Sequence, residues 1–240
     1  MGTSQAFADE LKVAVASNFY PTMKLIAKRY ELKTAGSSGQ EHRLILIPGS
    51  SGKHFSQIMN GAPFDVFFSA DIERARLLEQ EGRVIAGTRF TYALGRLILW
   101  SSIDNYVDSK GDVLNKKNFR YLAIANPKLA PYGQSAEEVL KSLKLWTNMK
   151  DRLVRGENIA QTFQFIASGN AQLGFVGYSQ ILNPGSTIDG SFWEVPQSIY
   201  KPIEQQAVLL QDSYIGRDFL SFVKSDESLG IIYESGYGLP

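Results

Sequence analysis

The sequence predicts an α/β protein of two lobes, each built on a mostly parallel sheet flanked by helices. Short apolar runs alternate with helical patterns along almost the whole chain, as in parallel sheets whose strands are joined by crossover helices. The chain has 240 residues, 44% of them hydrophobic, so it can bury one large core or two of roughly 100–120 residues each. Polar loops follow several of the apolar runs, which is where such sheets bind ligands.

Local signals bound the predicted elements. Pro21 suits the first turn of a helix, Asp71 precedes a helical run as its cap, and Ser135 and Glu138 have capping-box spacing. The expected strands are Leu11–Ala16, Leu44–Ile47, Val66–Ser69, Leu97–Trp100, Tyr121–Ala125, Leu173–Val176 and Ala207–Leu210. The expected helices lie near residues 21–31, 52–60, 71–81, 135–146, 159–168 and 216–225.

Two stretches predict where the chain crosses between lobes. A long strand-like run begins within Arg89–Gly95, and the chain returns to an apolar strand within Ile203–Val208. A lobe made from both ends of the chain, with the middle inserted, fits these crossings. We therefore expect residues 9–89 and 207–240 to form lobe one and residues 90–206 to form lobe two.

Composition excludes several classes of function. The formal charge of +1 argues against a broad electrostatic surface for nucleic acid or anionic membrane. No stretch approaches the roughly 18 uninterrupted apolar residues of a spanning helix. The absence of cysteine excludes disulfides, thiolate zinc sites and cysteine nucleophiles.

Four loops share one chemistry. Ser17-Asn18 and Ser50-Ser51 follow the first two strands, Pro131–Gln134 follows Tyr121–Ala125, and Asn158-Ile159 opens a later helix. Each can present hydroxyl or backbone N–H groups at the positive end of a helix dipole, which holds an anion without a full positive charge. Any one loop is explained by ordinary helix capping. The four together favour an anion site, although they do not name the anion.

Other catalytic motifs fit poorly. Gly49–His54 lacks the spacing and the Ser or Thr of a nucleotide phosphate loop, so Lys53 is expected on a solvated helix turn. A serine hydrolase needs a base near its nucleophile, and the two histidines, His42 and His54, are expected to be structural or solvated. Asp65 and Asp71 are expected to hold a turn and to cap a helix, because a carboxylate in an anion site would repel the ligand.

Several segments resemble the periplasmic molybdate-binding proteins of bacterial ABC transporters. They are Val13–Asn18, the Gly49–Gly52 turn, Gly61–Asp71, Ala123–Pro127 with Ala130–Gly133, and Gly174–Val176. Gly61–Asp71 is the most specific of them, and the similarity covers nearly the whole chain after residue 10.

The resemblance implies the two-lobed class II periplasmic binding protein fold, which closes by a hinge on one tetrahedral oxyanion. By the same resemblance the ligand is held by the hydroxyl and N–H groups of Ser17 and Ser51 and the N–H groups of Tyr132 and Ile159, with Asn18 contributing too. Some members add a Tyr hydroxyl at a position that aligns with Gly177, so the neighbouring Tyr178 is a candidate ligand. The metal, molybdenum or tungsten, is bound only as its oxyanion through these residues.

The resemblance also implies an extracytoplasmic receptor rather than an enzyme, a monomer in the periplasm without a cofactor, whose partner is the membrane permease of an ABC importer. A shell of neutral hydroxyls and N–H groups selects an anion by size and protonation, so we expect molybdate and tungstate to bind and sulfate to fit loosely. Three alternatives stay open: another oxyanion such as sulfate or phosphate, a phosphate-ester enzyme of the same fold, and a ligand-sensing regulatory module.

The N-terminus predicts export. Met1–Ser4 looks like a vector leader, and Gln5–Ala8 has the small-x-small form that ends a secretory signal, removed or truncated here. Cleavage after Ala8 would start the mature chain at Asp9. The alternative is a disordered tail of eight residues.

Overall fold

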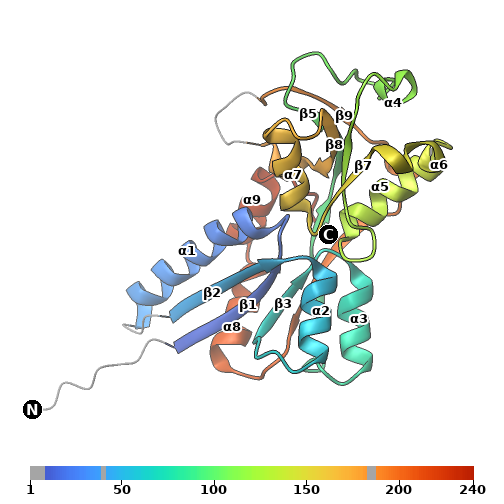
Figure 1. The fold of residues 1–240 in the computed structure, drawn as a ribbon. Coiled ribbons are helices and arrows are strands. Elements are labelled where there is room, and N and C mark those ends of the chain that lie inside the picture. The colour runs from blue at the N-terminus through green and yellow to red at the C-terminus, as the bar shows by residue number, and fades with distance from the viewer. Residues whose placement is uncertain (1–8, 39–41, 183–187) are drawn as a thin grey trace, which may run out of the picture.

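The computed structural model describes residues 9–38, 42–182 and 188–240 and has two lobes stacked end to end (Figure 1). The expected signal cleavage after Ala8 concerns residues outside this description. Over the described residues each lobe holds one five-stranded sheet. Lobe one has the order β2-β1-β3-β10-β4 and lobe two the order β7-β6-β8-β5-β9.

Lobe one is assembled from both ends of the chain. Its elements are β1 (Asp9–Ala16), α1 (Tyr20–Ser38), β2 (His42–Gly49), α2 (Ser51–Met59), β3 (Val66–Ser69), α3 (Ile72–Gln80), β4 (Phe90–Gly95), β10 (Ile203–Leu209), α8 (Tyr214–Val223) and α9 (Asp226–Glu234). Helices α1, α8 and α9 cover one face of the sheet, and α2 and α3 cover the other.

Lobe two holds the middle of the chain. Its elements are β5 (Leu97–Ser101), α4 (Val113–Lys116), β6 (Leu122–Ala125), α5 (Pro131–Ser142), α6 (Trp146–Met149), β7 (Leu153–Gly156), α7 (Ile159–Ala167), β8 (Leu173–Gly177) and β9 (Ser191–Glu194), with short 3-10 turns at Lys150–Arg152, Tyr178–Gln180 and Gln197–Ile199. Helices α5 and α7 cover opposite faces of the second sheet.

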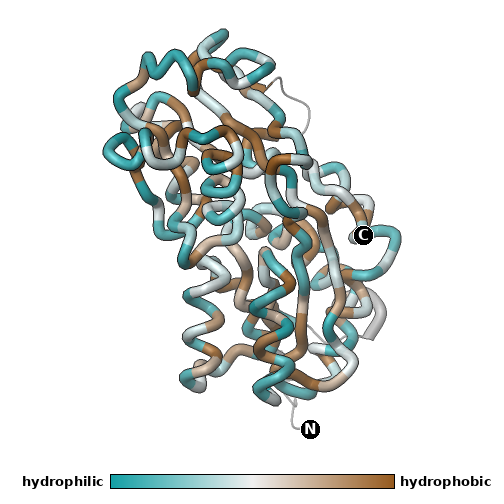
Figure 2. Tube along the Cα trace, turned by 90° about the vertical axis from the view of Figure 1, so that its right-hand side faces the viewer, coloured by the Kyte–Doolittle hydropathy of each residue, from teal (hydrophilic) through white to brown (hydrophobic). Residues whose placement is uncertain are grey.

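The apolar strands lie inside, between the helical layers (Figure 2). In β1, Val13 and Val15 pack towards α1 and α8, while Ala14 packs towards α2 and α3. Both faces of the strand are therefore buried, which explains why the apolar runs are continuous rather than alternating. The predicted α/β class is confirmed.

The sheets are mixed rather than mostly parallel. β1 pairs in parallel with β2 and β3, and β6 pairs in parallel with β7 and β8. β10 and β5 run antiparallel to their neighbours. These are the strands nearest the crossings, and they enter each sheet by a direct connection between lobes instead of by a crossover helix.

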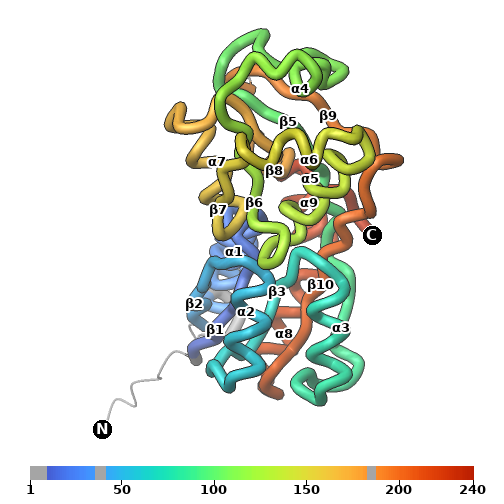
Figure 3. The backbone as a smooth tube through the Cα atoms, turned by 45° about the vertical axis from the view of Figure 1, so that its right-hand side comes forward, coloured from blue at the N-terminus to red at the C-terminus, as the bar shows by residue number. Residues whose placement is uncertain are grey.

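The crossings lie closer to the middle of the chain than residues 89/90 and 206/207. β4 and the whole of β10 pair within the first sheet, and β5 begins directly after Arg96. Figure 3 shows β10 running into lobe one beside β3. Sheet membership thus favours a lobe one that includes both connecting strands.

Candidate functional site

A small cavity of about 10 Å³ lies between the lobes, where the loops after several strands meet. A space of this size is about that of one water molecule, so it excludes a sugar or a nucleotide, and an ion of several atoms enters only if the lobes part slightly. All five predicted ligand residues line it. The lining consists of Ala16, Ser17, Asn18, Gly49, Ser50, Ser51, Ala70, Ala130, Pro131, Tyr132 and Ile159.

Lobe one supplies two serine hydroxyls. Ser17 follows β1, and its N–H, expected to bind the ligand, instead donates to the Gly49 carbonyl at 2.8 Å. In the described part of the chain its hydroxyl has no protein partner. The Ser51 hydroxyl accepts from the Ala70 N–H at 2.9 Å, so its own hydrogen remains free to donate. Ser50, not Ser51, caps α2 by accepting from the Lys53 N–H at 3.3 Å.

Lobe two supplies the first turns of two helices. Helix α5 begins at Pro131, four residues before the predicted Ser135 cap, and its N-cap Ala130 makes no side-chain cap bond. Proline is tolerated there because the first helical N–H has no partner in any case. The prediction that Ser135 and Glu138 open this helix was wrong. The consequence is that the N–H of Tyr132 lies in an uncapped first turn.

Helix α7 presents Ile159 in the same way. Its N-cap Asn158 accepts from the Gln161 N–H at 3.0 Å, which leaves the Ile159 N–H unused. Gln180 ties this turn to β8, since its amide donates to the Ile159 carbonyl at 3.1 Å and accepts from the Gly177 N–H at 2.9 Å. The loop that carries Ile159 is therefore held in place from behind.

The cavity concentrates positive potential without a cation. Within the described residues, the backbone N–H groups of Asn18, Ser51, Tyr132 and Ile159 donate to no protein acceptor. The first N–H groups of a helix have no intrahelical partner and carry about half a positive charge together. No Asp, Glu, Lys, Arg or His is among the described residues that line the cavity. Such an arrangement suits a small anion, because the N–H groups at the start of a helix attract negative charge.

The side chain of Asn18 is already hydrogen-bonded to two other residues of lobe one, Gln205 in β10 and Tyr237 near the C-terminus. Its side-chain amide donates to the Gln205 side-chain oxygen at 2.7 Å and to the Tyr237 hydroxyl at 3.2 Å, and the backbone carbonyl of Asn18 accepts from the Tyr237 hydroxyl at 2.8 Å. Asn18 therefore has its backbone N–H, rather than its amide, to offer a ligand. Sequence reasoning missed Gln205 and Tyr237. The sequence offered one signal for Gln205, a pair of glutamines at the start of an otherwise apolar run. In the structure Gln205 is 0% exposed.

Tyr132 is buried between the lobes. Its hydroxyl lies 3.5 Å from the Gln205 amide nitrogen, and burial raises the pKa of this hydroxyl well above its usual value. The ring occupies space that only glycine leaves free: a Cβ at Gly95 would lie 2.4 Å from the hydroxyl oxygen, and one at Gly177 would lie 3.1 Å from the ring.

Tyr178 is not brought to the cavity. Its N–H donates to the Arg96 carbonyl at 2.9 Å, and its ring stacks under the Arg96 guanidinium, 4.3 Å from the ring centre, and beside Phe192. The space beside Gly177 that faces the site is already filled by Tyr132.

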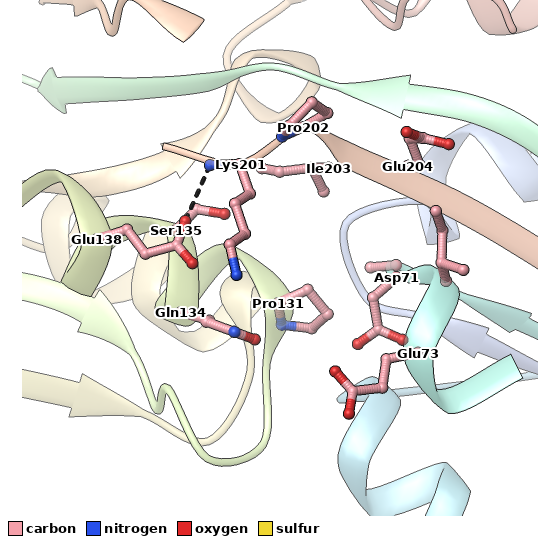
Figure 4. Close-up of a pocket in the computed structure, with 12 residues that line it drawn as sticks. Asp71, Glu73, Pro131, Gln134, Ser135, Glu138, Lys201, Pro202, Ile203 and Glu204 are labelled. Atoms are coloured by element: carbon pink, nitrogen blue, oxygen red, sulfur yellow. Dashed lines mark hydrogen bonds between the residues drawn. The ribbon is translucent and has the colours of Figure 1, made fainter. Parts of the chain in front are cut away.

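The nearby carboxylates stand outside the cavity. A larger interlobe cavity of about 200 Å³ borders it at Ala70 and Pro131, with Asp71 and Glu73 on one side and Glu138 beside Lys201 on the other (Figure 4). Asp71 caps α3 by accepting from the Arg74 N–H at 2.9 Å and forms an ion pair with the Arg74 guanidinium.

Asp65 holds the turn before β3, because its carboxylate accepts from the Lys12 N–H at 2.7 Å. The structural roles predicted for Asp65 and Asp71 are confirmed.

His54 is buried behind Gly49 and is not among the residues that line the cavity. A Cβ at Gly49 would lie 2.7 Å from its Nε2, and this nitrogen has no partner among the described residues. Burial lowers the pKa of His54.

Across the described ranges no cluster of His, Asp and Glu could hold a metal cation. In the same ranges no helix has both the length and the apolar character that a membrane span requires.

Known proteins share this architecture. Residues 11–238 match the family described as bacterial extracellular solute-binding protein. The chain is 46% identical over 237 residues to the molybdate-binding protein ModA of Azotobacter vinelandii, covering 98% of this chain and 92% of that protein. It is 43% identical to ModA of Rhodobacter capsulatus, covering 97% and 89%. The solved structure of the periplasmic molybdate-binding protein of Azotobacter vinelandii superposes with a TM-score of 0.90 at 39% identity, covering 96% of this chain and 99% of that chain.

Proposed function

The chain belongs to the bacterial extracellular solute-binding protein family, and we propose that it captures molybdate between its lobes and delivers it to an ABC permease. One observation carries this function: hydroxyl and N–H donors from both lobes, free among the described residues, converge on one small cavity, and its described lining has no charged side chain. A compact dianion is the ligand that such a site favours, because every contact is a charge-assisted hydrogen bond in a water-excluded space.

We propose six donors for the anion. They are the hydroxyls of Ser17 and Ser51 and the backbone N–H groups of Asn18, Ser51, Tyr132 and Ile159. The position of each beside the cavity and the absence of a competing protein acceptor among the described residues support this set. Tyr178 is left out because its ring stacks on Arg96.

The choice among oxyanions follows from size and protonation. Tungstate resembles molybdate in both respects, so both are expected to bind. Sulfate is smaller and would leave some donors out of reach. A protonated phosphate needs an acceptor for its hydrogen, and the described lining offers no carboxylate.

The same geometry accounts for a receptor rather than an enzyme. The relatives above are named as binding proteins, and among the described residues the His54 ring contacts Gln57 through Nδ1 and has no partner at Nε2, so it is paired with no serine. We propose a monomer in the periplasm. Molybdate would stabilise the form in which both lobes share it, by as much as its affinity for that form exceeds its affinity for the open one.

The test is thermal unfolding with molybdate, tungstate, sulfate and phosphate at equal ionic strength. A ligand at about 1,000 times its Kd stabilises the folded protein by about 4 kcal/mol. For a chain of this length that corresponds to a rise in Tm on the order of 10 °C. A rise with molybdate and tungstate alone supports the proposal. A rise only with sulfate or phosphate would change the cargo, and no rise with any of them would reject an oxyanion receptor.

A further inference from the structure

A backbone contact between the lobes lies beside the anion cavity. The N–H of Gly52, in the first turn of α2, donates to the carbonyl of Leu129 in lobe two at 2.8 Å. The two backbones touch because Gly52 has no side chain. A Cβ there would lie 2.8 Å from the Leu129 oxygen and 3.0 Å from the Leu129 Cα. The first distance is shorter than Cβ atoms show in real structures, and the second is tighter than nine in ten real Cβ contacts.

Neither partner can retreat within its own lobe. The turn that carries Leu129 is closed by the N–H groups of Leu129 and Ala130, which donate to the Asn126 carbonyl at 3.0 and 2.9 Å. Asn126 in turn donates its N–H to the Gly156 carbonyl at 2.7 Å. Gly52 belongs to a helix whose start is fixed by the Ser50 cap. A side chain at residue 52 must therefore separate the lobes.

Other contacts at the same mouth of the cleft are weaker or adaptable. Arg74 donates to the Lys128 carbonyl at 3.2 Å through the end of a flexible side chain. Lys53 pairs with Glu157 at 2.7 Å, but the two side chains are 50% and 45% exposed. Solvent-exposed pairs of this kind contribute little. Of these contacts, the one between Gly52 and Leu129 joins two backbones, so it cannot adapt as the side-chain contacts can.

We propose that Gly52 is a positioning residue for oxyanion binding, whose bare backbone lets α2 dock on the 126–130 turn and so hold the cleft closed. This inference rests on the proposed function. The docking brings Ser51, the neighbour of Gly52, against the lobe that carries Tyr132 and Ile159. A larger residue at position 52 would leave lobe one folded, since the third atom it meets is the flexible Arg74 Nη2 at 3.2 Å, yet it would hold the two halves of the donor set apart.

The experiment compares Gly52→Ala with Gly230→Ala. Gly230 is also helical, in α9, and a Cβ there would meet no atom of the described residues within 4 Å. Binding of molybdate is measured by calorimetry, its release by stopped-flow, and closure by the radius of gyration with and without molybdate. We expect Gly230→Ala to match the parent. Gly52→Ala should raise the Kd roughly 5- to 150-fold, the range typical of forced overpacking, mainly through faster release. It should contract less on adding molybdate, with the Tm of the free protein near that of the parent.

Lys53→Ala distinguishes the contribution of the Lys53–Glu157 ion pair to binding from that of the backbone contact. It should raise the Kd less than about fivefold, as for a solvent-exposed pair. A second measurement needs no variant: hydrogen exchange of the Gly52 amide in the parent should slow at least about tenfold when molybdate is added, because the amide gains its acceptor on closure.

Parental affinity and contraction in Gly52→Ala, or unchanged exchange at Gly52, would overturn the inference while leaving the proposed function intact. A parent that does not bind molybdate would overturn both.

Discussion

Ser51→Ala and Ser17→Ala each remove one serine hydroxyl from the same cavity, but the structure predicts different consequences for the two variants. The Ser51 hydroxyl also accepts the Ala70 N–H at 2.9 Å, and Ser51 and Ala70 are 1% and 2% exposed. The Ser17 hydroxyl has no partner among the described residues. Losing Ser51 therefore leaves the Ala70 N–H of lobe one without its acceptor, whereas losing Ser17 leaves no such donor.

The magnitudes follow from these contacts. Each hydroxyl would donate one hydrogen bond to a charged ligand, worth about 1.5–3 kcal/mol, so each variant should raise the Kd for molybdate roughly 10- to 150-fold. The stranded Ala70 N–H adds a cost of about 1–3 kcal/mol to Ser51→Ala alone. For a chain of this length that cost lowers the Tm of the free protein by about 2–12 °C.

Calorimetric titration with molybdate measures the first effect, and thermal unfolding without ligand measures the second. We expect both variants to lose affinity and only Ser51→Ala to lose stability. Parental affinity in both variants would show that lobe one does not hold the anion through these serines. An equal loss of stability in both would refute the hydrogen-bond assignment at Ser51.

Three further outcomes are expected. Tyr132→Phe keeps the backbone donor and loses a buried neutral hydrogen bond of about 0.5–1.5 kcal/mol, so titration should give a smaller rise in Kd than for Ser51→Ala. Tyr178→Phe should bind molybdate as the parent does, because that ring lies on Arg96; a tenfold loss would return Tyr178 to the site. Burial lowers the pKa of His54 in the folded protein below that of the unfolded chain, about 6.5. The unfolded chain then binds more protons, so stability present above about pH 6.5 is lost as the pH falls. The fall in Tm between about pH 7 and pH 5.5 should be smaller in His54→Leu, and an equal fall would contradict a neutral buried His54.

Local sequence determined the elements and the chemistry of their ends. Val66–Ser69 is a strand with the bounds expected from its apolar run, and Asp71 and Asn158 cap the helices that follow them. These features depend on residues within one turn or one strand, where apolar periodicity and capping chemistry act directly. The four binding loops could be found in this way because each joins a strand to a helix.

The start of α5 shows where local reasoning failed. Ser135 and Glu138 have a capping box's spacing, yet the helix begins at Pro131. A local pattern gives several possible starts, and the one adopted leaves the Tyr132 N–H without a cap. The direction of a strand within its sheet could not be predicted from local sequence either. Nothing within β10 reveals that it runs antiparallel to β3, since a strand has the same period in either direction.

The sequence by itself determined an α/β fold whose polar loops carry neutral donors. Tertiary structure alone decided that the Asn18 amide serves Gln205 and Tyr237, that Tyr178 lies on Arg96, and that Gly52 meets Leu129. The physical reason is that these contacts join residues far apart in the chain. They exist only once strand register and lobe closure have determined where the backbones meet. Apolar periodicity and capping residues give no information on which distant residues will come into contact.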